Sequence, residues 1–467
     1  MVTNTLAKDF EHTFAGLTIE ERGKLKGATI LVTGCGGFLG YYFMRFFQSK
    51  ADDLELKKVI GLDNFMLGYP QWIEELSKDS LFDIQKFDII KDKIEKVNGA
   101  AEADYIIHMA SIASPVFYRQ YPIETLDANI WGLRSLLDFY KERTIKGFLF
   151  YSSSELYGNP DSEHVPTSEE YYGYVCATGP RACYDESKRF GETMCMLFAQ
   201  KYNMPIGVAR PFNNYGPGMR INDKRVPADF ALAIKENRNI EILSNGSPTR
   251  TFCYIADSIN GYLKILLYGK YDYFNIGIEK PEISISQLAE IYVSAGKDIF
   301  GYTGKVVYAI SDDSEYLTNN PQRRCPKIEK AQRILGYNPS ISVEEGVKRF
   351  LKFIKETKEF ESEQHVKAWL IRVGMNAAKS LFNSSWYKKN VPLEDNIVFE
   401  TPQESDVYYA VAELDEKYRT VIHLFYYEDM SVAEIAGYLN EKENTVKSKL
   451  RRGREILKEK LKGGFDI

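Results

Sequence analysis

The segment Ala28-Thr-Ile-Leu-Val-Thr-Gly-Cys-Gly-Gly-Phe-Leu-Gly40 decides the fold class. Its apolar, β-branched start predicts a buried strand, which runs directly into Gly34, Gly37 and Gly40. Residues 41–47 then predict a helix. Glycines at this spacing allow a tight turn and close approach of the backbone to a pyrophosphate, and the helix N-terminus offers free amides to an anion. The segment therefore predicts a dinucleotide-binding α/β unit.

A second strand, Lys58-Val-Ile-Gly-Leu-Asp63, follows at the expected distance and ends in a carboxylate. Asp63 can accept from a ribose 2′-hydroxyl and would repel a 2′-phosphate, so the sequence favours NAD over NADP. Strand and helix patterns then alternate, with a third strand-like segment closing at Asp88 and Ile89, a fourth over 103–110, a helix over 129–141 and a fifth strand over 147–152. We predict a Rossmann-type doubly wound parallel sheet with a small substrate-binding lobe.

Tyr184 and Lys188 are four residues apart, in a segment that we expect to be helical after Pro180. On one helix face the ammonium would lie beside the phenol and favour the phenolate, which makes the pair a proton-transfer device. By itself the spacing more often means two residues on a solvated helix. The serines at 152–154 and Glu155 leave the carboxyl end of the fifth strand, where we expect them to face the same crevice.

Composition limits the possible classes of protein. The chain has 467 residues, 44% of them hydrophobic and 27% charged, with net charge −5. This length predicts two or more domains, and the charge argues against a chain that is wholly nucleic-acid-binding. The start reads as a charged N-terminal extension, residues 1–26, without a signal peptide, and no apolar run approaches the ~20 residues of a membrane span. The six cysteines lack C-x-x-C spacing, so we expect no metal site, no disulfide framework and a cytoplasmic location.

Five motifs match one family together. They are Thr-Gly-x-x-Gly-Phe-x-Gly at 33–40, Asp63-Asn64, Ser-Ser-x-x-x-Tyr-Gly at 152–158, the Tyr184/Lys188 pair, and Pro-Phe-Asn-Asn-Tyr-Gly-Pro at 211–217. Residues 27–360 thus resemble the extended short-chain dehydrogenase/reductase family, the NAD-dependent sugar-nucleotide epimerases, dehydratases and decarboxylases. The resemblance implies that Ser153 assists Tyr184 in removing the sugar 4-hydroxyl proton as hydride passes to NAD, that Lys188 holds the nicotinamide ribose, and that the enzyme domain forms a homodimer.

The side chains around the dyad favour one branch of that family. A 4,6-dehydratase carries an Asp-Glu pair where this chain has Ser154-Glu155, and a simple 4-epimerase needs no carboxylate there. Ser154-Glu155, Ala110-Ser111-x-Ala-Ser-Pro, Gly-Pro-Arg-Ala-Cys-Tyr-Asp-Glu at 179–186 and Asn-Pro-Gln-Arg-Arg at 320–324 resemble the UDP-glucuronic acid decarboxylases. By that resemblance Arg324 is the cation or acid of the decarboxylation and Glu155 is its partner. An epimerase or a dehydratase remains the alternative.

The resemblance also supplies two sets of expected contacts. For the NAD cofactor they are Gly34, Gly37, Phe38, Leu39, Gly40, Asp63, Asn64, Asp88, Ile89, Ala110, Tyr184 and Lys188. For the UDP-sugar substrate they are Ser111, Tyr118, Ser154, Asn213, Arg225 and Arg250, of which Asn213 and the two arginines bind the diphosphate. Three positions depart from the family pattern: Gly218 replaces an arginine, Cys176-Ala177 an asparagine-proline, and Cys325 a lysine. These departures leave a related acidic sugar nucleotide open as substrate.

The last hundred residues read as an all-α module. Residues 366–379 predict a helix, 383–403 a polar linker, and Ser431-Val-Ala-Glu434 a capping box that starts the first helix of a helix-turn-helix. In the second helix Val446 and Leu450 would face inward, and nine basic residues between 442 and 462 face three acidic ones. We expect the outward residues to contact DNA: Thr445, Lys447, Ser448, Arg451 and Arg452.

This module resembles a sigma-70 family factor of the extracytoplasmic-function type, with a remnant of region 2 at 362–390 and a region 4 at 404–462. The helices that normally clamp RNA polymerase do not precede it, because the enzyme-like part stands in their place. We therefore expect weak promoter binding without initiation of transcription by this chain alone. A regulator whose enzyme half only senses a sugar nucleotide is the rival interpretation, and the sequence leaves open whether the fusion is natural or a gene-joining artefact.

Overall fold

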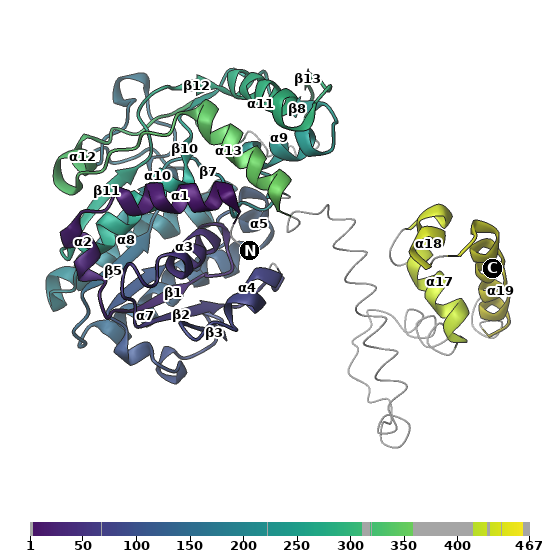
Figure 1. Ribbon diagram of the computed structural model, residues 1–467, viewed down its shortest axis with the longest axis horizontal. Helices are drawn as coiled ribbons and strands as arrows, with labels where there is room; N and C mark the ends of the chain where they lie inside the picture. Colours follow the sequence, from purple (N-terminus) through teal and green to yellow (C-terminus); the bar gives the residue numbers. More distant parts are fainter. Residues whose placement is uncertain are drawn as a thin grey trace. The chain divides into compact units, whose positions relative to one another are not determined.

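The computed structural model describes residues 3–66, 68–221, 223–310, 318, 320–357, 414–426, 430–439 and 441–460. The chain divides into two compact units, Met1–Phe360 and Glu361–Ile467, each described here by itself (Figure 1).

A seven-stranded parallel sheet forms the centre of the first unit. Its order is β11-β6-β5-β4-β1-β2-β3, so the chain winds outward from β1 in both directions and leaves a switch point between β1 and β4. The strands are β1 Thr29–Thr33, β2 Lys58–Asp63, β3 Phe82–Lys86, β4 Tyr105–His108, β5 Gly147–Tyr151, β6 Ile206–Pro211 and β11 Asp272–Ile276. The doubly wound sheet that the sequence predicts is confirmed.

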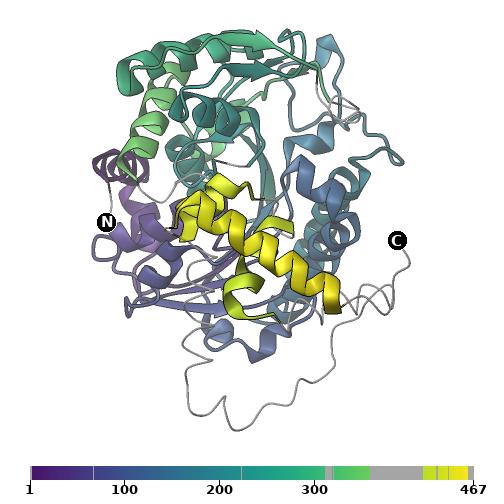
Figure 2. The same cartoon turned by 90° about the vertical axis from the view of Figure 1, so that its right-hand side faces the viewer.

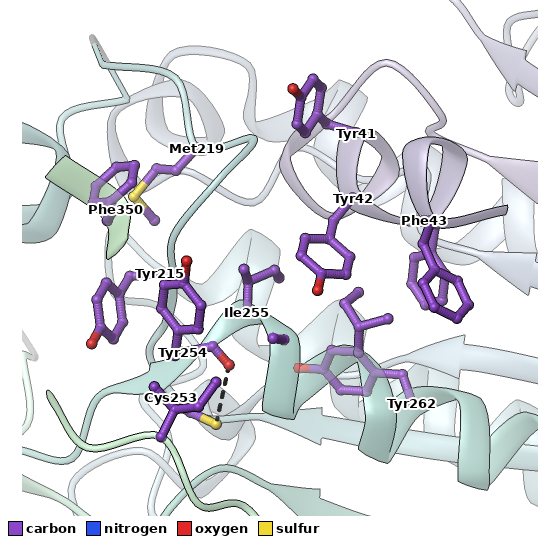
Figure 3. Packing of buried hydrophobic residues seen from close by; sticks show 14 of the residues in the cluster. Tyr41, Tyr42, Phe43, Tyr215, Met219, Cys253, Tyr254, Ile255, Tyr262 and Phe350 are labelled. Carbon is purple, nitrogen blue, oxygen red and sulfur yellow. Dashed lines mark hydrogen bonds between the residues drawn. The ribbon is translucent and has the colours of Figure 1, made fainter. Parts of the chain in front are cut away.

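Helices cover both faces of this sheet. α3 (Phe38–Ser49) and α10 (Ile255–Tyr268) pack on one face, and α7 (Leu133–Tyr140) and α8 (Ala182–Tyr202) pack on the other. Successive side chains of β1 alternate between these two cores, which is why all five of its residues are buried. Figure 3 shows part of the first core, with Tyr42 of α3 and Tyr262 of α10 inside the cluster.

A smaller lobe completes the unit. It contains the sheet β12-β9-β14, made of Ile283–Ser284, Thr249–Arg250 and Arg323–Arg324, and the pair β13-β8, made of Val306–Tyr308 and Ile240–Ile242. α9 (Val226–Lys235) and α11 (Ile285–Phe300) support these strands. β9 pairs in parallel with β14, and this pairing places Arg324 directly opposite Arg250. The pairing thereby fixes the position of Arg324 in the candidate active site.

The charged N-terminal segment is folded against the enzyme core. α1 (Asn4–Ala15) packs on α10 and lies beside α13 (Val343–Glu356), as Figure 2 also shows, and α2 (Ile19–Lys24) follows it. Asp9 is fully buried and accepts hydrogen bonds from Tyr254 OH (2.6 Å) and Arg349 Nη1 (3.0 Å). Burial is the largest influence on this carboxyl and raises its pKa to about 6.

The remaining elements of this unit are short connections. They are α4 Gln71–Leu76, η1 Ile94–Lys96, η2 Ala100–Glu102, α5 Pro115–Gln120, α6 Pro122–Asp127, η3 Ala128–Gly132, η4 Ser154–Tyr157, η5 Ser162–His164, β7 Asn214–Tyr215, β10 Cys253–Tyr254 and α12 Glu329–Leu335.

Several predicted boundaries differ from the observed ones. The third strand ends at Lys86, so Asp88 and Ile89 lie in the turn that follows it. The helix predicted over 129–141 begins with a π-helical turn, η3, before α7. α13 ends at Glu356, where Thr357 caps it in an extended conformation.

Three helices form the described part of the second unit: α17 Glu416–Tyr426, α18 Val432–Leu439 and α19 Glu443–Lys460. The predicted capping box is present, because Ser431 N donates to Glu434 Oε2 (2.8 Å) and Glu434 N to Ser431 Oγ (3.3 Å). Val446 and Leu450 are buried against α17 and α18, as predicted. Gly453 lets α19 approach α17 closely, since a Cβ there would lie 2.9 Å from Ile422 Cγ1. The helix predicted over 366–379 and the linker at 383–403 lie outside the described residues.

None of the described helices combines the length and the apolar composition that a bilayer crossing requires. All six cysteines are free thiols. Among the described residues no three ligand-type side chains come together in a way that could hold a metal ion.

Candidate active site

The glycine-rich loop joins β1 to α3 at the switch point of the sheet. Gly34 has φ +74°, and a Cβ on it would lie 2.9 Å from the amide nitrogen of Ala110, while a Cβ on Gly40 would lie 2.3 Å from the carbonyl oxygen of Cys35. Gly37 caps α3 without a side-chain hydrogen bond, so the amides of Phe38 and Leu39 in the first turn have no intrahelical partner. The loop therefore has the close backbone approach and the free helix N-terminus that a pyrophosphate requires.

Asp63 lies beside this loop at the carboxyl end of β2. Its Oδ2 accepts from Gly36 N (2.9 Å) and its Oδ1 from Phe65 N (2.7 Å). Burial raises the pKa of Asp63, and these two N–H groups and the nearby charge of Arg220 act in the opposite direction. The carboxylate is thus fixed where a ribose hydroxyl would reach it.

The other predicted cofactor residues surround the same edge of the sheet. Asn64 Oδ1 accepts from Met66 N (3.0 Å), and Asp88 Oδ1 accepts from Ile90 N (3.0 Å), so both side chains order short turns. Ile89 packs against Gly132 of η3, where a Cβ would lie 2.7 Å from Ile89 Cγ1. Ala110 N donates to Thr33 Oγ1 (3.2 Å), which holds the end of β4 against the glycine-rich loop.

Tyr184 and Lys188 lie in the first two turns of α8, both buried, with the Lys188 ammonium 5.5 Å from the centre of the Tyr184 ring. Lys188 Nζ donates to the carbonyl oxygen of Tyr151 (2.9 Å) at the end of β5. Ser153 also hydrogen-bonds Tyr184. The structure brings these three predicted residues together.

The prediction that Lys188 lowers the pKa of Tyr184 is wrong for this structure. Burial is the dominant influence and raises the pKa of Tyr184 to about 12, although the hydrogen bond from Ser153 opposes it. Burial likewise lowers the pKa of Lys188 to about 7. His108 lies near Lys188, and burial together with that cation lowers its pKa to about 3, so it is neutral. Desolvation of a closed site therefore outweighs the attraction between phenolate and ammonium.

Glu155 lies between two guanidinium groups. Arg324 donates to it through two parallel bonds, Nη1 to Oε1 (2.6 Å) and Nη2 to Oε2 (2.5 Å), and Arg181 Nη2 also donates to Oε2. All three side chains are at most 17% exposed. Burial alone would raise the pKa of Glu155, but Arg181 and Arg324 outweigh it and lower this pKa well below its usual value. The carboxylate is therefore ionised and fixed in orientation.

Two predicted substrate residues, Tyr118 and Ser154, lie next to this cluster, and a third, Ser111, follows β4. The ring of Tyr118 stacks on that of Tyr184 with centres 5.1 Å apart and an interplanar angle of 14°, which confines the Tyr184 phenol. Ser154 is buried in η4, and Ser111 follows β4 at the same edge of the sheet.

Arg250 is held by the segment that leads to Arg324. Its Nη1 donates to the carbonyl oxygens of Thr249 (2.7 Å) and Gln322 (3.1 Å), and its Nη2 to Asn320 Oδ1 (3.1 Å) and the carbonyl oxygen of Pro321 (2.6 Å). Burial and the neighbouring Arg324 lower the pKa of Arg250 to about 9. Three of these four bonds go to segment 320–322 and the fourth to the neighbouring residue Thr249, so the predicted diphosphate contact stays a prediction.

The two other predicted diphosphate contacts also bond within the chain. Asn213 Nδ2 donates to the carbonyl oxygen of Thr251 (2.9 Å), and Arg225 pairs with Asp223 through Nη2 and Oδ2 (2.9 Å). The Arg225 guanidinium also lies 5.3 Å from the centre of the Phe38 ring, which places it beside the glycine-rich loop.

The positions that depart from the family pattern have structural reasons. Gly218 has φ +95°, and a Cβ there would lie 2.6 Å from the carbonyl oxygen of Phe38, so this backbone does not admit the usual arginine. Arg220, two residues later, lies close enough to Asp63 to lower its pKa. Cys325 is buried with Sγ 3.2 Å from the carbonyl oxygen of Glu279, and burial raises its pKa to about 12, so it is a neutral thiol where the family has a lysine cation.

Several buried polar atoms on these segments have no hydrogen-bond partner among the residues that the structure describes. They include Ser111 Oγ, Tyr118 OH, Asn129 Oδ1, Ser152 Oγ, Asp185 Oδ1, Thr251 Oγ1 and Arg324 Nε. A buried polar group without a partner is costly, so such a concentration indicates surfaces that a polar ligand satisfies. Hydroxyl-rich groups such as a ribose and a sugar fit this donor and acceptor set, and the glycine-rich loop fits a dinucleotide.

The sequence interpretation assigned no role to Arg181, Asp185 or Arg220. A role for Arg181 and Asp185 could have been predicted from the sequence, because Arg181, Tyr184, Asp185 and Lys188 recur at the spacing of one helix face. No sequence signal marked Arg220, since its neighbour Asp63 lies far away in the chain.

A doubly wound sheet with a glycine-rich loop at its switch point and a Ser-Tyr-Lys group beside it defines an enzyme that uses a dinucleotide cofactor. The model of the NAD dependent epimerase/dehydratase family matches residues 30–277, and that of sigma-70, region 4, matches residues 405–457. UDP-glucuronic acid decarboxylase 1 of Xenopus tropicalis is 33% identical over 335 residues, 71% of this chain and 73% of its own length. The chain belongs to the NAD dependent epimerase/dehydratase family and carries a C-terminal sigma-70 region 4 domain.

Solved structures of the family are similar in fold. UDP-glucose 4-epimerase of Thermotoga maritima, with UDP-glucose, has a TM-score of 0.60 at 25% identity and is matched over 70% of this chain and 98% of its own. UDP-glucuronic acid 4-epimerase of Bacillus cereus, in complex with NAD, has a TM-score of 0.57 at 25% identity with the same coverage. NAD is thus the cofactor of this family and of its solved neighbours.

The sigma-70 region 4 domain exposes one side of α19. Thr445, Lys447, Ser448, Arg451 and Arg452 are all exposed, as the sequence predicts. Lys447 pairs with Glu443 (3.6 Å) and Arg451 with Glu455 (3.8 Å), both within the helix. Ion pairs as exposed as these two contribute little stability. Lys447 and Arg451 can therefore leave their carboxylate partners and pair with phosphate groups instead.

Proposed function

We propose that the enzyme unit decarboxylates a UDP-uronic acid, converting UDP-glucuronate to UDP-xylose by transient oxidation at C4. The observation that carries this proposal is the buried Glu155–Arg324 pair beside the Ser153, Tyr184 and Lys188 group. A decarboxylation needs a cation for the carboxylate and a nearby acid or base, which an epimerisation does not require. The similarity to UDP-glucuronic acid decarboxylase 1 supports the same assignment.

In the first step the phenolate form of Tyr184, which burial disfavours and the hydrogen bond from Ser153 favours, takes the proton of the sugar 4-hydroxyl. NAD, when bound, would supply the hydride acceptor for the oxidation at C4 and the hydride donor for its re-reduction. The residues that would hold it are the glycine-rich loop, Asp63 and Lys188, whose ammonium would reach the nicotinamide ribose. The closed, desolvated surroundings of the dyad exclude competing water.

In the second step the new C4 ketone lies β to the C5 carboxylate. The C5–C6 bond breaks, carbon dioxide leaves, and the electron pair enters an enolate through the ketone. A proton then adds to C5 and the hydride returns to C4, so the reaction involves no net oxidation. Arg324 would hold the departing carboxylate and act as the acid toward C5, with the ionised Glu155 as its partner.

The rival function is an epimerisation without loss of carbon, as in the 4-epimerases of similar fold. The full chain, incubated with NAD and UDP-glucuronate, should yield a UDP-pentose by mass spectrometry and leave UDP-glucose unchanged. Interconversion of UDP-hexoses or UDP-hexuronates with every carbon retained would replace this proposal by the epimerase assignment.

We also propose that the sigma-70 region 4 domain binds duplex promoter DNA through the exposed basic side of α19. A second helix of a helix-turn-helix presents its outward residues to the major groove and the phosphates. A complete Ser153, Tyr184 and Lys188 group favours a catalytic enzyme unit over one that only senses a sugar nucleotide.

The homodimer that the family resemblance implies remains part of this proposal. Three large apolar side chains on η3 and α8 support it, because they are more than half exposed: Trp131, Phe190 and Leu197.

A further inference from the structure

The position of Arg181 links two parts of the candidate active site, the Tyr184 group and the Glu155 cluster. It is the residue directly before α8, and with Tyr184, Asp185 and Lys188 it recurs at the spacing of one helix face. Its guanidinium lies 5.9 Å from the centre of the Tyr118 ring, the ring that stacks on Tyr184. Arg181 therefore connects the proton-transfer group to the Glu155 cluster.

Arg181 shares the Glu155 carboxylate with Arg324. Its Nη2 donates to Oε2 of Glu155, and its Nε lies 3.4 Å from Oδ2 of Asp185, one turn along the helix. The side chain of Arg181 is 10% exposed, so these interactions are screened little by solvent. The single negative charge of Glu155 is thus shared by the guanidinium groups of Arg181 and Arg324, and it fully neutralises neither of them.

Arg324 consequently keeps hydrogen-bonding capacity. A guanidinium has five N–H groups, and Arg324 gives one from Nη1 and one from Nη2 to Glu155. Its Nε is buried and has no partner in the described part of the chain. A buried charged donor without an acceptor is expensive, so this group points to an anionic ligand.

The local charges agree with that conclusion. Three cations, Arg181, Arg250 and Arg324, face two carboxyl groups, Glu155 and Asp185, which leaves an excess of one positive charge (3 − 2 = 1) when both acids are ionised. A second carboxylate would balance this excess, whereas a neutral hexose would not.

We propose that Arg181 is a positioning residue that fixes Glu155 and thereby leaves Arg324 free to bind the carboxylate of a nucleotide-linked uronic acid. The inference rests on the proposed function and deepens it, because it assigns the preference for an acidic sugar to a cluster of three side chains. Arg181 itself does not touch the reacting carbons.

The test uses the full chain with Arg181→Leu and Arg181→Lys, and Arg134→Gln as a control that removes an exposed arginine of α7. Formation of the 4-keto sugar and of NADH reports oxidation, and release of carbon dioxide reports decarboxylation. Misplacing Glu155 and Arg324 should slow carbon dioxide release about 100-fold in Arg181→Leu. The rate of oxidation should change less than about threefold. Arg181→Lys should release carbon dioxide about ten times faster than Arg181→Leu, because lysine keeps the positive charge but lacks the planar fork of a guanidinium.

Binding separates this inference from the function on which it rests. The wild type should bind UDP-glucuronate more tightly than UDP-glucose by calorimetry, and Arg181→Leu should lose about tenfold of that preference, the value of one charge-assisted hydrogen bond. Equal losses of both steps, or an unchanged preference in a variant that melts like the wild type, would overturn the role of Arg181. A wild type without either carbon dioxide release or a preference overturns the decarboxylase assignment, and this inference with it.

Discussion

Arg324 and Glu155 form a two-bond pair at 2.6 and 2.5 Å although 169 residues separate them in the chain. Glu155 lies in η4, which follows β5 of the main sheet, and Arg324 ends β14 of the smaller lobe. Pairing of β14 with β9 and the bond from Thr167 N to the carbonyl oxygen of Cys325 (2.8 Å) fix the lobe in this position. The pair to which we assign the decarboxylation is thus assembled from both lobes.

Removing either member of this pair should affect the second half of the reaction more than the first. Glu155→Gln and Arg324→Ala should each lower carbon dioxide release about 100-fold or more, because the partner is left buried and uncompensated. Oxidation at C4 should fall far less, so the 4-keto sugar should accumulate in rapid-quench samples. Arg323→Ala is the matched control, because Arg323 pairs with Glu282 and is 41% exposed. Equal loss of both steps would refute the roles given to Glu155 and Arg324.

Tyr184→Phe should remove the first step altogether. Loss of a positioned general base costs about 100- to 10 000-fold, and no NADH should form in a single turnover. Tyr172→Phe, at a 90% exposed tyrosine, should behave like the wild type. Substantial NADH formation by Tyr184→Phe would show that another group removes the proton.

The sequence predicted the glycine-rich loop, Asp63 and the Tyr184/Lys188 pair because each depends on local chain geometry. The spacing could not show how deeply the pair is buried, and so it gave the wrong direction for the pKa of Tyr184. Arg250 illustrates the same limit, since three of its four carbonyl and amide acceptors come from a segment about seventy residues later in the chain. Contacts between distant segments depend on tertiary packing, which a local pattern does not contain.

Burial of Lys188 should make the enzyme less stable at neutral and acidic pH. Its folded-state pKa is about 7, whereas a free lysine titrates near pH ~10, so the unfolded chain binds more protons between these values and stability rises with pH across that window. That pKa difference corresponds to about 4 kcal/mol of destabilisation of the folded state by the buried charge. Replacing Lys188 by an apolar residue would remove this cost, but it would also remove the hydrogen bond to the Tyr151 carbonyl, which contributes about 2 kcal/mol.

Lys188→Met should therefore raise the free energy of unfolding of the enzyme unit by about 2 kcal/mol at pH 6, and the effect should change sign toward pH 10, where mainly the loss of the hydrogen bond to the Tyr151 carbonyl remains. Urea titrations at the two pH values measure this, with Lys201→Met, at an exposed lysine of α8, as control. A variant that is less stable than the wild type at pH 6 would contradict the burial argument.

The glycine-rich loop should not tolerate a side chain at Gly34. A Cβ would lie 2.9 Å from Ala110 N at a backbone φ of +74°, so Gly34→Ala must displace the loop from β4. We expect this displacement to cost about 2 kcal/mol of strain. The affinity for NAD, measured by calorimetry, should therefore fall about 30-fold. Gly336→Ala has a similar φ, +63°, with open space around it, and should leave NAD binding intact. Unchanged affinity in Gly34→Ala would argue against this loop as the pyrophosphate site.

DNA binding by the sigma-70 region 4 domain should depend steeply on salt. Each neutralised phosphate adds about one unit to the log-log salt slope, so Arg451→Gln combined with Arg452→Gln should reduce the slope by about two. Lys417→Gln, at an exposed lysine of α17 paired with Asp415, is the control. Gel shifts of the full chain at two salt concentrations provide the comparison, and a slope that the double variant leaves unchanged would exclude this side of α19 as the contact surface.

The central claim is tested most directly by the fate of the substrate carboxylate. The full chain is supplied with NAD and UDP-glucuronate carrying carbon-13 at C6, and the reaction is followed by NMR spectroscopy. The account predicts that the label appears in carbon dioxide and bicarbonate in equal amount to the UDP-xylose formed. Label that remains in a nucleotide-linked sugar after turnover would contradict it.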